Sequence, residues 1–471
     1  MADQELWRKS VRELAALIRE RKISPLELLD SQLSAIERFN PKLNAIVTLA
    51  ADQAREAARA AEQAVIRGEK IGRLHGIPIG VKDITPTAGI RTTYGSPLFK
   101  DNVPAEDAEV ITRLKTAGAI VLAKTNTPEF AAGANTVNPV FGATRNPWNA
   151  ALSPAGSSGG SAAAVASGML PIAQGTDFGC SIRIPAAFCG IVGIRPTPGL
   201  TPNYPMRLGW DPGQVHGPLA RTAEDAAIFL DAIVGFTRRS PISVAPPWSS
   251  TYDAVEKTRD AKGLRIAFAR DIAGIGVDTE VETICRKAAN GMRDHGAMVE
   301  EIDFDLSAGR DPYKTWRGVW MVGQQFRNLP RLDEFGENLK GNVKSGLNIT
   351  TKDIALAEET RIALFQKMAT LFERYDVLMT PAAPVKPYPV DENFPSEING
   401  KVFDNYIDWI APAFLITLLS LPAASVPAGL TADNLPVGLQ IVGQRFDEPR
   451  LLGLAKIVAQ ANPTGWPPIS R

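Results

Sequence analysis

The sequence is poor in the residues that build metal sites and disulfide frameworks. Its 471 residues include only three cysteines and three histidines, and no two cysteines have the Cys-x-x-Cys spacing of a zinc pair. A sparse, odd number of cysteines fits a reducing compartment better than a disulfide scaffold. We therefore expect no metal, no cofactor and a cytoplasmic location.

The chain also lacks net charge. Lys+Arg and Asp+Glu both number 51, so there is no bulk charge to bind nucleic acid or an anionic membrane surface. A neutral surface protects little against self-association, which leaves a monomer or a homodimer open. The first residues, MADQELWRKS, are polar and acidic and do not resemble a signal peptide.

Long apolar runs are scarce as well. The uncharged stretch from Ile410 to Ala432 has the length of a membrane span, but Pro412, Pro422 and Pro427 interrupt it. Because proline breaks a helix interior, this stretch is not expected to cross a membrane. We expect it to form buried strand and loop.

What is present is an alternation of helical and extended segments. The run Ser24-Pro25-Leu26-Glu27 is a capping box with proline at the first helical position, which predicts a helix to about Phe39. Short apolar strands at about 77–81, 119–124, 171–176 and 264–269 alternate with helices. This alternation predicts α/β layers around a mixed or parallel sheet.

Residues 146–194 contain only two charged side chains, Asp177 and Arg183. So apolar a segment is expected to be buried, and a buried charge is costly unless it is paired. We expect the two residues to brace a turn together. The alternative is that each pairs with an unrelated partner.

Within this segment, AGSSGGSAAAVASG allows three interpretations. A phosphate-binding Walker loop needs a lysine, which is missing. A nucleophile elbow centred on Ser158 must follow a strand, whereas the preceding NPWNAALSPA is typical of a loop. A glycine-rich turn into a helix over 159–169 remains. Helix capping alone explains Ser157 or Ser158, but the flanking glycines suggest close backbone approach.

Ser181, in GTDFGCSIRIP, has no histidine near it in the sequence that could act as a base. Lysine takes that part in Ser-Lys hydrolases, provided that burial lowers its pKa toward the working pH. Lys82 is a candidate because it ends an apolar strand, on the face shared with Pro78 and Gly80. From position alone, an exposed lysine at a strand end is the simpler interpretation.

Three segments together resemble the amidase signature family: GVKDI around Lys82, SPAGSSGGSAAAVASG from Ser153, and GTDFGCSIRIPAAFCGIVGIRPT from Gly175. The intervals agree too, with 75 residues from Lys82 to Ser157 and 24 from Ser157 to Ser181. The likeness covers nearly the whole chain. It implies one domain over residues 1–471, with a large mixed sheet covered by helices on both faces and a helical N-terminal region, 1–70, packed on it.

The resemblance implies an amidohydrolase with a Ser-cisSer-Lys triad. Ser181 would be the nucleophile, Ser157 the proton relay after a cis peptide bond, and Lys82 the base. The backbone N–H groups of the oxyanion hole and the supporting side chains carry over as Phe178, Gly179, Cys180 and Ser181, and as Ser158 beside Lys82 and Asp177 with Arg183 on the loop. Cys180 departs from the family, which usually has Gly-Gly before the nucleophile.

The sequence contains little information about the substrate. Likeness to the family puts the segments 203–213 and 314–320 near the pocket, so that Arg207, Trp210, Trp316 and Trp320 are candidates. We expect a small apolar or aryl amide, or a carbamate (urethane), although the tryptophans could equally belong to the core. The alternatives are a glutamine-amidase subunit of an amidotransferase complex and a non-catalytic ligand-binding member of the family.

Overall fold

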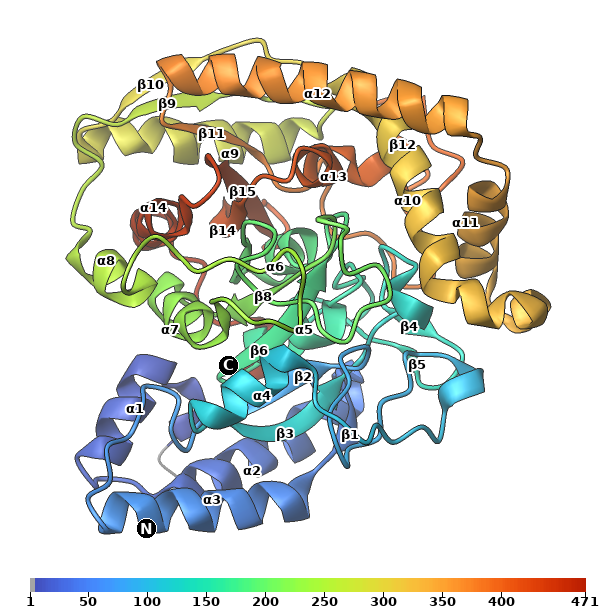
Figure 1. Cartoon of the computed structure of the whole chain (residues 1–471). Helices are drawn as coiled ribbons and strands as arrows, with labels where there is room; N and C mark the ends of the chain where they lie inside the picture. Colours follow the sequence, from blue (N-terminus) through green and yellow to red (C-terminus); the bar gives the residue numbers. More distant parts are fainter. Residues whose placement is uncertain (1–4) are drawn as a thin grey trace.

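An eleven-stranded mixed sheet runs through the computed structural model, which describes residues 5–471 (Figure 1). The strand order is β1-β3-β2-β6-β8-β7-β14-β15-β11-β9-β10. β2 runs parallel to β3 and β6, and β9 runs parallel to β10 and β11, while the other neighbours are antiparallel. The strands of this sheet are β1 (Ile46–Leu49), β2 (Pro78–Lys82), β3 (Ile120–Thr125), β6 (Ile172–Asp177), β7 (Val192–Arg195), β8 (Val215–Ala220), β9 (Arg265–Phe268), β10 (Met298–Glu301), β11 (Val377–Pro381), β14 (Ala423–Leu430) and β15 (Pro436–Val442). Two hairpins stand apart from it, β4 (Val137–Asn138) with β5 (Gly142–Ala143) and β12 (Glu397–Ile398) with β13 (Lys401–Val402).

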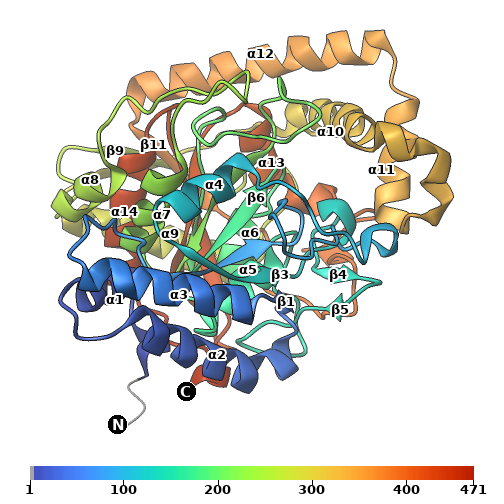
Figure 2. The same ribbon diagram turned by 60° about the horizontal axis from the view of Figure 1, so that its bottom comes forward.

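Helices cover both faces of the sheet (Figures 1 and 2). One hydrophobic core joins the sheet to α1, α4, α7, α9 and α14, and another joins it to α2, α3, α5 and α6. A third core lies among α6, α10, α12 and α13. The helices are α1 (Val11–Arg19), α2 (Pro25–Leu43), α3 (Ala51–Ile66), α4 (Glu109–Thr116), α5 (Gly159–Ala166), α6 (Arg183–Cys189), α7 (Ala223–Ile233), α8 (Thr251–Lys257), α9 (Thr279–Gly291), α10 (Arg310–Gln325), α11 (Glu337–Leu347), α12 (Thr351–Arg374), α13 (Ala411–Leu418) and α14 (Glu448–Ala461). This confirms the predicted α/β class, with a mixed sheet.

The described part of region 1–70 contains the helices α1, α2 and α3 and also the strand β1. The predicted capping box begins α2, because Ser24 Oγ accepts a hydrogen bond from the Glu27 amide and the Glu27 carboxylate accepts one from the Ser24 amide. The helix runs to Leu43, beyond the expected end, and stops at Asn44 in the left-handed conformation. The first four residues of the region 1–70 lie outside the described residues.

The stretch 410–432 differs from the expectation of strand and loop. Its first half is the buried helix α13, and its second half is the strand β14. The expectation was wrong for the first half because Pro412 stands in the first turn of α13, where the missing N–H breaks no hydrogen bond. Within residues 5–471, no helix has both the length and the apolar character that spanning a bilayer needs.

Two neighbouring strands, β2 and β6, end at the edge of the sheet where the candidate site lies. β2 ends at Lys82 and β6 ends at Asp177, and since these strands are parallel their carboxyl ends meet at one edge. Ile79 and Val81 point into the core under α7, as their alternation predicts. Gly80 faces the opposite side, where a Cβ would lie 2.5 Å from Leu170 Cδ1, so that any larger residue would force the Leu170 side chain to shift.

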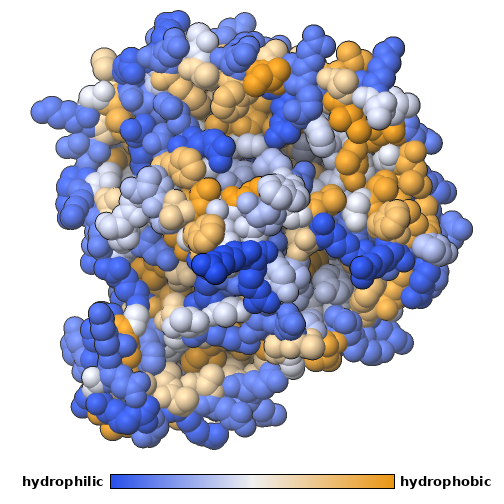
Figure 3. Space-filling model, viewed as in Figure 1, coloured by the Kyte–Doolittle hydropathy of each residue, from blue (hydrophilic) through white to orange (hydrophobic). Residues whose placement is uncertain are grey.

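The molecular surface is mainly hydrophilic on the face shown in Figure 3, but hydrophobic side chains gather over α10 and α11. Phe326 and Leu347, at the ends of these helices, are among the exposed large hydrophobic residues. Helix α10 also forms one wall of the site described next.

Candidate active site

Lys82 is fully buried at the end of β2, with its ammonium group held by two hydroxyls. Nζ donates to Ser157 Oγ at 2.6 Å and to Thr176 Oγ1 at 3.0 Å. Burial lowers the pKa of Lys82 to about 7, although Asp177 and Cys180 act in the opposite direction. A sizeable fraction of Lys82 is therefore neutral near pH 7, and a neutral amine can accept a proton.

Ser157 stands in the turn before α5, and the Gly156–Ser157 peptide bond is cis. The glycines around it are crowded by backbone and side-chain atoms. A Cβ would lie 3.0 Å from the Asn135 carbonyl carbon at Gly156, 2.3 Å from Thr136 Oγ1 at Gly159, and 2.3 Å from the Asn126 amide at Gly160. The close backbone approach that the glycines suggested is confirmed.

Ser181 and Ser157 line the same small cavity, together with Thr176, Gly179 and Cys180. In the described part of the chain no hydrogen bond joins the two serine hydroxyls, but the segments are tied by their backbones, because the Ser158 amide donates to the Ser181 carbonyl at 3.2 Å. The cavity is narrow, about 20 Å³, which is room for about one water molecule. A substrate can therefore enter only when lining side chains move.

In the loop from Asp177 to Ser181, the carbonyl groups accept hydrogen bonds, whereas the amides of residues 178–181 donate none that the described residues accept. Every one of its five carbonyl oxygens accepts a hydrogen bond; the donors are the side chains of Arg195, Tyr313, Arg183 and Thr417 and the amides of Ile184 and Ser158. Among residues 5–471, no acceptor is bonded to the amides of Phe178, Gly179, Cys180 and Ser181. Backbone donors of this kind can stabilise an oxyanion that forms beside Ser181.

Asp177 and Arg183 form a fully buried, bidentate ion pair, as the sequence predicts. Arg183 Nε donates to Asp177 Oδ2 at 3.1 Å and Nη2 donates to Oδ1 at 2.9 Å. Burial alone would raise the pKa of Asp177, but Arg183, Arg195 and the Ile182 amide hold it below its usual value. Because Arg183 also donates to the Gly179 carbonyl at 2.7 Å, the pair orients the loop.

Cys180 is buried against the turn that carries Ser157. Its Sγ donates to the Gly156 carbonyl at 3.4 Å. Burial, with a smaller contribution from Asp177, raises the pKa of Cys180 to about 12. The thiol therefore stays protonated and fills space between the two serine segments.

Ser158 is linked to Lys82 through Thr176, whereas the resemblance implies that Ser158 itself orients the lysine. Its Oγ donates to the Thr176 carbonyl at 3.2 Å and accepts from the Thr176 amide at 3.3 Å. Thr176, and not Ser158, contacts the Lys82 ammonium. Sequence reasoning missed Thr176, and regular strand pairing would not have found it, because the register of β2 and β6 sets Val81 beside Gln174 and so Lys82 beside Gly175.

Of the four proposed pocket residues, Trp320 lines the cavity. Its ring stacks on Phe178 with centroids 4.5 Å apart. The other three lie elsewhere: Trp210 is 79% exposed, Arg207 donates to the Gln324 carbonyl on the surface, and Trp316 packs against the core under α12.

Among the other lining residues, Arg317 lies in the segment 314–320 that likeness to the family placed near the pocket, while the rest come from segments that carried no such indication. These other lining residues are Phe130, Ala131 and Gly133 before β4, Gln214 before β8, Arg317 and Met321 on α10, and Tyr406 and Ile410 before α13. Phe130 and Ala131 both have positive φ, 46° and 59°, a costly backbone conformation that the surrounding structure must enforce.

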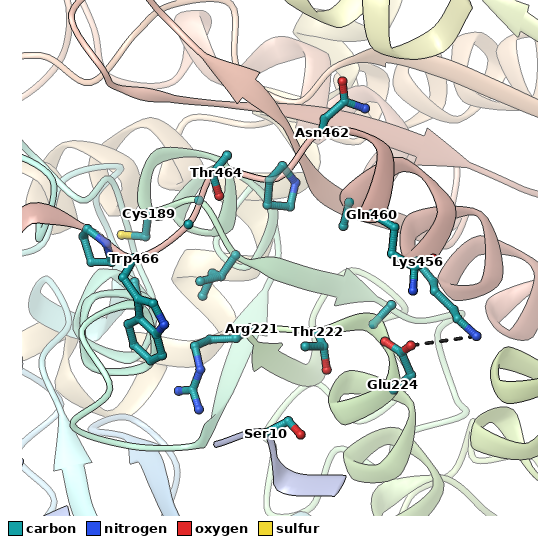
Figure 4. A pocket seen from close by; sticks show the side chains of 18 of the residues that line it. Ser10, Cys189, Arg221, Thr222, Glu224, Lys456, Gln460, Asn462, Thr464 and Trp466 are labelled. Carbon is teal, nitrogen blue, oxygen red and sulfur yellow. Dashed lines mark ion pairs between the residues drawn. The ribbon is translucent and has the colours of Figure 1, made fainter. Parts of the chain in front are cut away.

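A larger cavity, about 460 Å³, lies elsewhere (Figure 4). Arg221 and Trp466 lie on one side of it, and the ion pair between Lys456 and Glu224 lies on another. Neither Lys82, Ser157 nor Ser181 lines it. Volume alone therefore does not favour the candidate site, whereas the buried lysine and the two serines do.

The chain is similar to known amidases and their relatives along most of its length. The model of the family described as Amidase matches residues 27–452. An acylamidase from Rhodococcus erythropolis is 35% identical over 455 residues, which cover 94% of this chain and 93% of that protein. A glutamyl-tRNA(Gln) amidotransferase subunit from Gluconobacter oxydans is 36% identical over 478 residues, 94% of each chain. The structure of a bacterial aryl acylamidase of the amidase signature family matches with a TM-score of 0.90 and 31% identity, over 97% of this chain and 96% of that one.

Proposed function

Because the chain belongs to the amidase signature family of amidohydrolases, we propose that it hydrolyses small apolar or aryl amides and carbamates with Ser181 as nucleophile. The proposal takes residues 1–471 as one amidase signature domain. The observation that carries it is the buried hydrogen bond from Lys82 Nζ to Ser157 Oγ, beside a cavity that Ser157 and Ser181 both line.

In the proposed mechanism, the proton of Ser181 travels through Ser157 to neutral Lys82. The Ser181 side chain rotates to meet the Ser157 hydroxyl, its oxygen attacks the carbonyl carbon, and the Lys82 amine takes up the proton that Ser157 passes on. The same route then returns a proton to the departing amine. Water hydrolyses the resulting acyl-enzyme by the reverse relay.

The open amides of residues 178–181 would receive the oxyanion of the tetrahedral intermediate. They are backbone donors, so the side chain of Cys180 leaves their number unchanged. The bonded carbonyls hold the loop in place before the substrate arrives, which reduces the reorganisation needed at the transition state.

The wall of the cavity supports an apolar or aromatic substrate. Phe130, Phe178, Trp320, Met321 and Ile410 all line it. The Phe178–Trp320 pair offers a flat surface on which an aryl ring can stack.

The test is hydrolysis by the purified chain alone. We expect it to release nitroaniline from 4-nitroacetanilide, and a brief incubation followed by mass spectrometry to find the acyl group on the peptide that contains Ser181. Ser181→Ala should lose activity by a factor of about 10³ or more. Ser425→Ala is a matched control, since Ser425 is a buried serine outside the cavity and has no hydrogen-bond partner among residues 5–471. Activity of Ser181→Ala close to the wild type would refute the assignment.

A second candidate is a glutamine-amidase subunit of an amidotransferase, favoured by the 36% identity to the Gluconobacter oxydans protein. It predicts that glutamine is cleaved and anilides are not, and that activity needs a partner. Anilide or carbamate hydrolysis by the isolated chain would exclude it. A non-catalytic ligand-binding role would give no turnover on any of these substrates.

A further inference from the structure

Arg317, on α10, is a buried cation in the wall of the cavity that Ser181 lines. Only 5% of its surface is exposed. Nε donates to Asn342 Oδ1 at 2.8 Å, Nη1 to the Tyr313 hydroxyl at 3.2 Å, and Nη2 to the Tyr406 hydroxyl at 2.7 Å. All three acceptors are neutral.

No carboxylate of residues 5–471 lies within ion-pair distance of Arg317. The other fully buried arginines beside the site differ, because Arg183 and Arg195 share Asp177 as a counter-ion. A buried charge without a counter-ion is costly, and the cost is recovered when an anion binds.

Hydrogen-bond donors remain open at this point of the cavity. A guanidinium has five N–H donors. Three of those of Arg317 have partners, and two have none within residues 5–471. The Tyr406 hydroxyl, which also lines the cavity, accepts from Arg317 and, at 2.6 Å, from Asn342 Nδ2. Its own hydrogen has no acceptor in the described chain and can also be donated to a ligand.

We propose that Arg317 and Tyr406 bind a carboxylate of the substrate, so that the preferred substrates are amides or carbamates that carry an acidic group. This rests on the proposed function and specifies its substrate class. The apolar part would lie on Phe178 and Trp320, and the acid would lie at the α10 wall. Two N–H groups and one O–H match the acceptor sites of a carboxylate.

The test measures binding in the Ser181→Ala variant, so that its outcome does not depend on turnover. Two matched pairs of probes are compared by calorimetry. 4-Acetamidobenzoate against 4-methylacetanilide places the acid on the amine side of the amide, and succinanilate against butyranilide places it on the acyl side. We expect the acid of at least one pair to bind about tenfold more tightly or better, as charge-assisted hydrogen bonds should allow.

Adding Arg317→Gln should remove this preference while the neutral probes bind as before. Arg361→Gln is the matched control, since Arg361 donates to the Leu418 carbonyl outside the cavity, and it should keep the preference. If Arg317→Gln does not fold, Tyr406→Phe, which removes one donor, should weaken the acid and not the neutral probe.

Equal binding of acid and neutral probes in both pairs would overturn the inference, as would a preference that survives Arg317→Gln. A merely structural role for Arg317 predicts equal losses for both members of a pair. Hydrolysis of neutral anilides by the wild type is scored separately, so that failure of the proposed function and failure of this inference give different results.

Discussion

The ammonium nitrogen of Lys82 lies 2.6 Å from the hydroxyl oxygen of Ser157, and both side chains are buried. The lysine reaches this position because β2 ends there, and the serine reaches it because crowded glycines shape the turn before α5. Burial keeps water from the contact and lowers the pKa of the lysine to about 7. The predictions below begin from this pair.

The pH dependence of catalysis should report the ionisation of Lys82. Only the neutral amine accepts a proton, so kcat/KM of the wild type for a neutral anilide should rise with pH and level off above an apparent pKa near 7. Lys82→Arg, which stays charged, should be inactive at every pH. The measurement is a rate profile from pH 5 to 9, and a profile that falls with pH across this range would contradict the assignment.

Stability should also depend on pH through Lys82. Its pKa is about 7 in the folded chain and about 10.4 when unfolded, so between these values the unfolded chain binds more protons and folding becomes more favourable as pH rises. Below pH 7 both states are protonated and the dependence vanishes. Lys82→Met lacks this contribution. The melting temperature of the wild type minus that of Lys82→Met should therefore increase from pH 7 to 10, and a constant difference would show that Lys82 is not buried as a neutral amine.

Asp177→Asn should destabilise the fold strongly, since it leaves Arg183 and Arg195 buried without a counter-ion. The expected loss in free energy of unfolding is about 3–5 kcal/mol, measured by urea denaturation. Glu69→Gln breaks the exposed pair with Arg67 and is the control, for which little change is expected. Comparable effects of the two variants would mean that the buried pair does not hold the loop.

Gly179→Ala should displace the backbone amides of residues 178–181, which are proposed to bind the oxyanion. The added Cβ would lie 2.6 Å from the Tyr313 hydroxyl, and Tyr313 cannot retreat easily because it stacks on Phe414 with centroids 4.0 Å apart. We expect a loss of about 1–3 kcal/mol in stability and a fall in kcat of about tenfold to a hundredfold. Gly341→Ala, on α11 with open space around its Cα, should leave kcat unchanged. An unaltered kcat for Gly179→Ala would remove this loop from the mechanism.

The cysteines should be unreactive in the folded protein. Cys180, Cys189 and Cys285 are all buried, and burial raises the pKa of each thiol above its usual value, that of Cys180 to about 12. Ellman's reagent should detect no thiol in the native state and three in guanidinium chloride. Rapid modification of Cys180 in the native protein would instead indicate that the thiol, which lines the cavity, is also reactive there.

Local pattern was sufficient where neighbours in the chain decide the structure. The capping box at Ser24, the alternating faces of β2 and the pairing of Asp177 with Arg183 were all predictable from short segments. The helix α13 was missed because Pro412 was treated as a helix breaker, whereas in a first turn it breaks no hydrogen bond.

The distant walls of the cavity were not predictable in this way. Thr176 reaches Lys82 across two parallel strands, and Arg317 and Tyr406 arrive from α10 and from the segment before α13. Trp210 and Trp316 looked equivalent to Trp320 in the sequence, and only the fold places Trp320 in the cavity and Trp210 in solvent.

The sequence by itself determined the α/β class, because hydrophobic period and helix caps act through adjacent residues. Its resemblance to the amidase signature family supplied a short set of candidate residues. Tertiary structure alone decided that Lys82 is buried, that the amides of 178–181 are left open and that Arg317 has no counter-ion among residues 5–471. Desolvation and charge pairing depend on every atom within a few ångströms, and most of those atoms belong to residues that are far away along the chain.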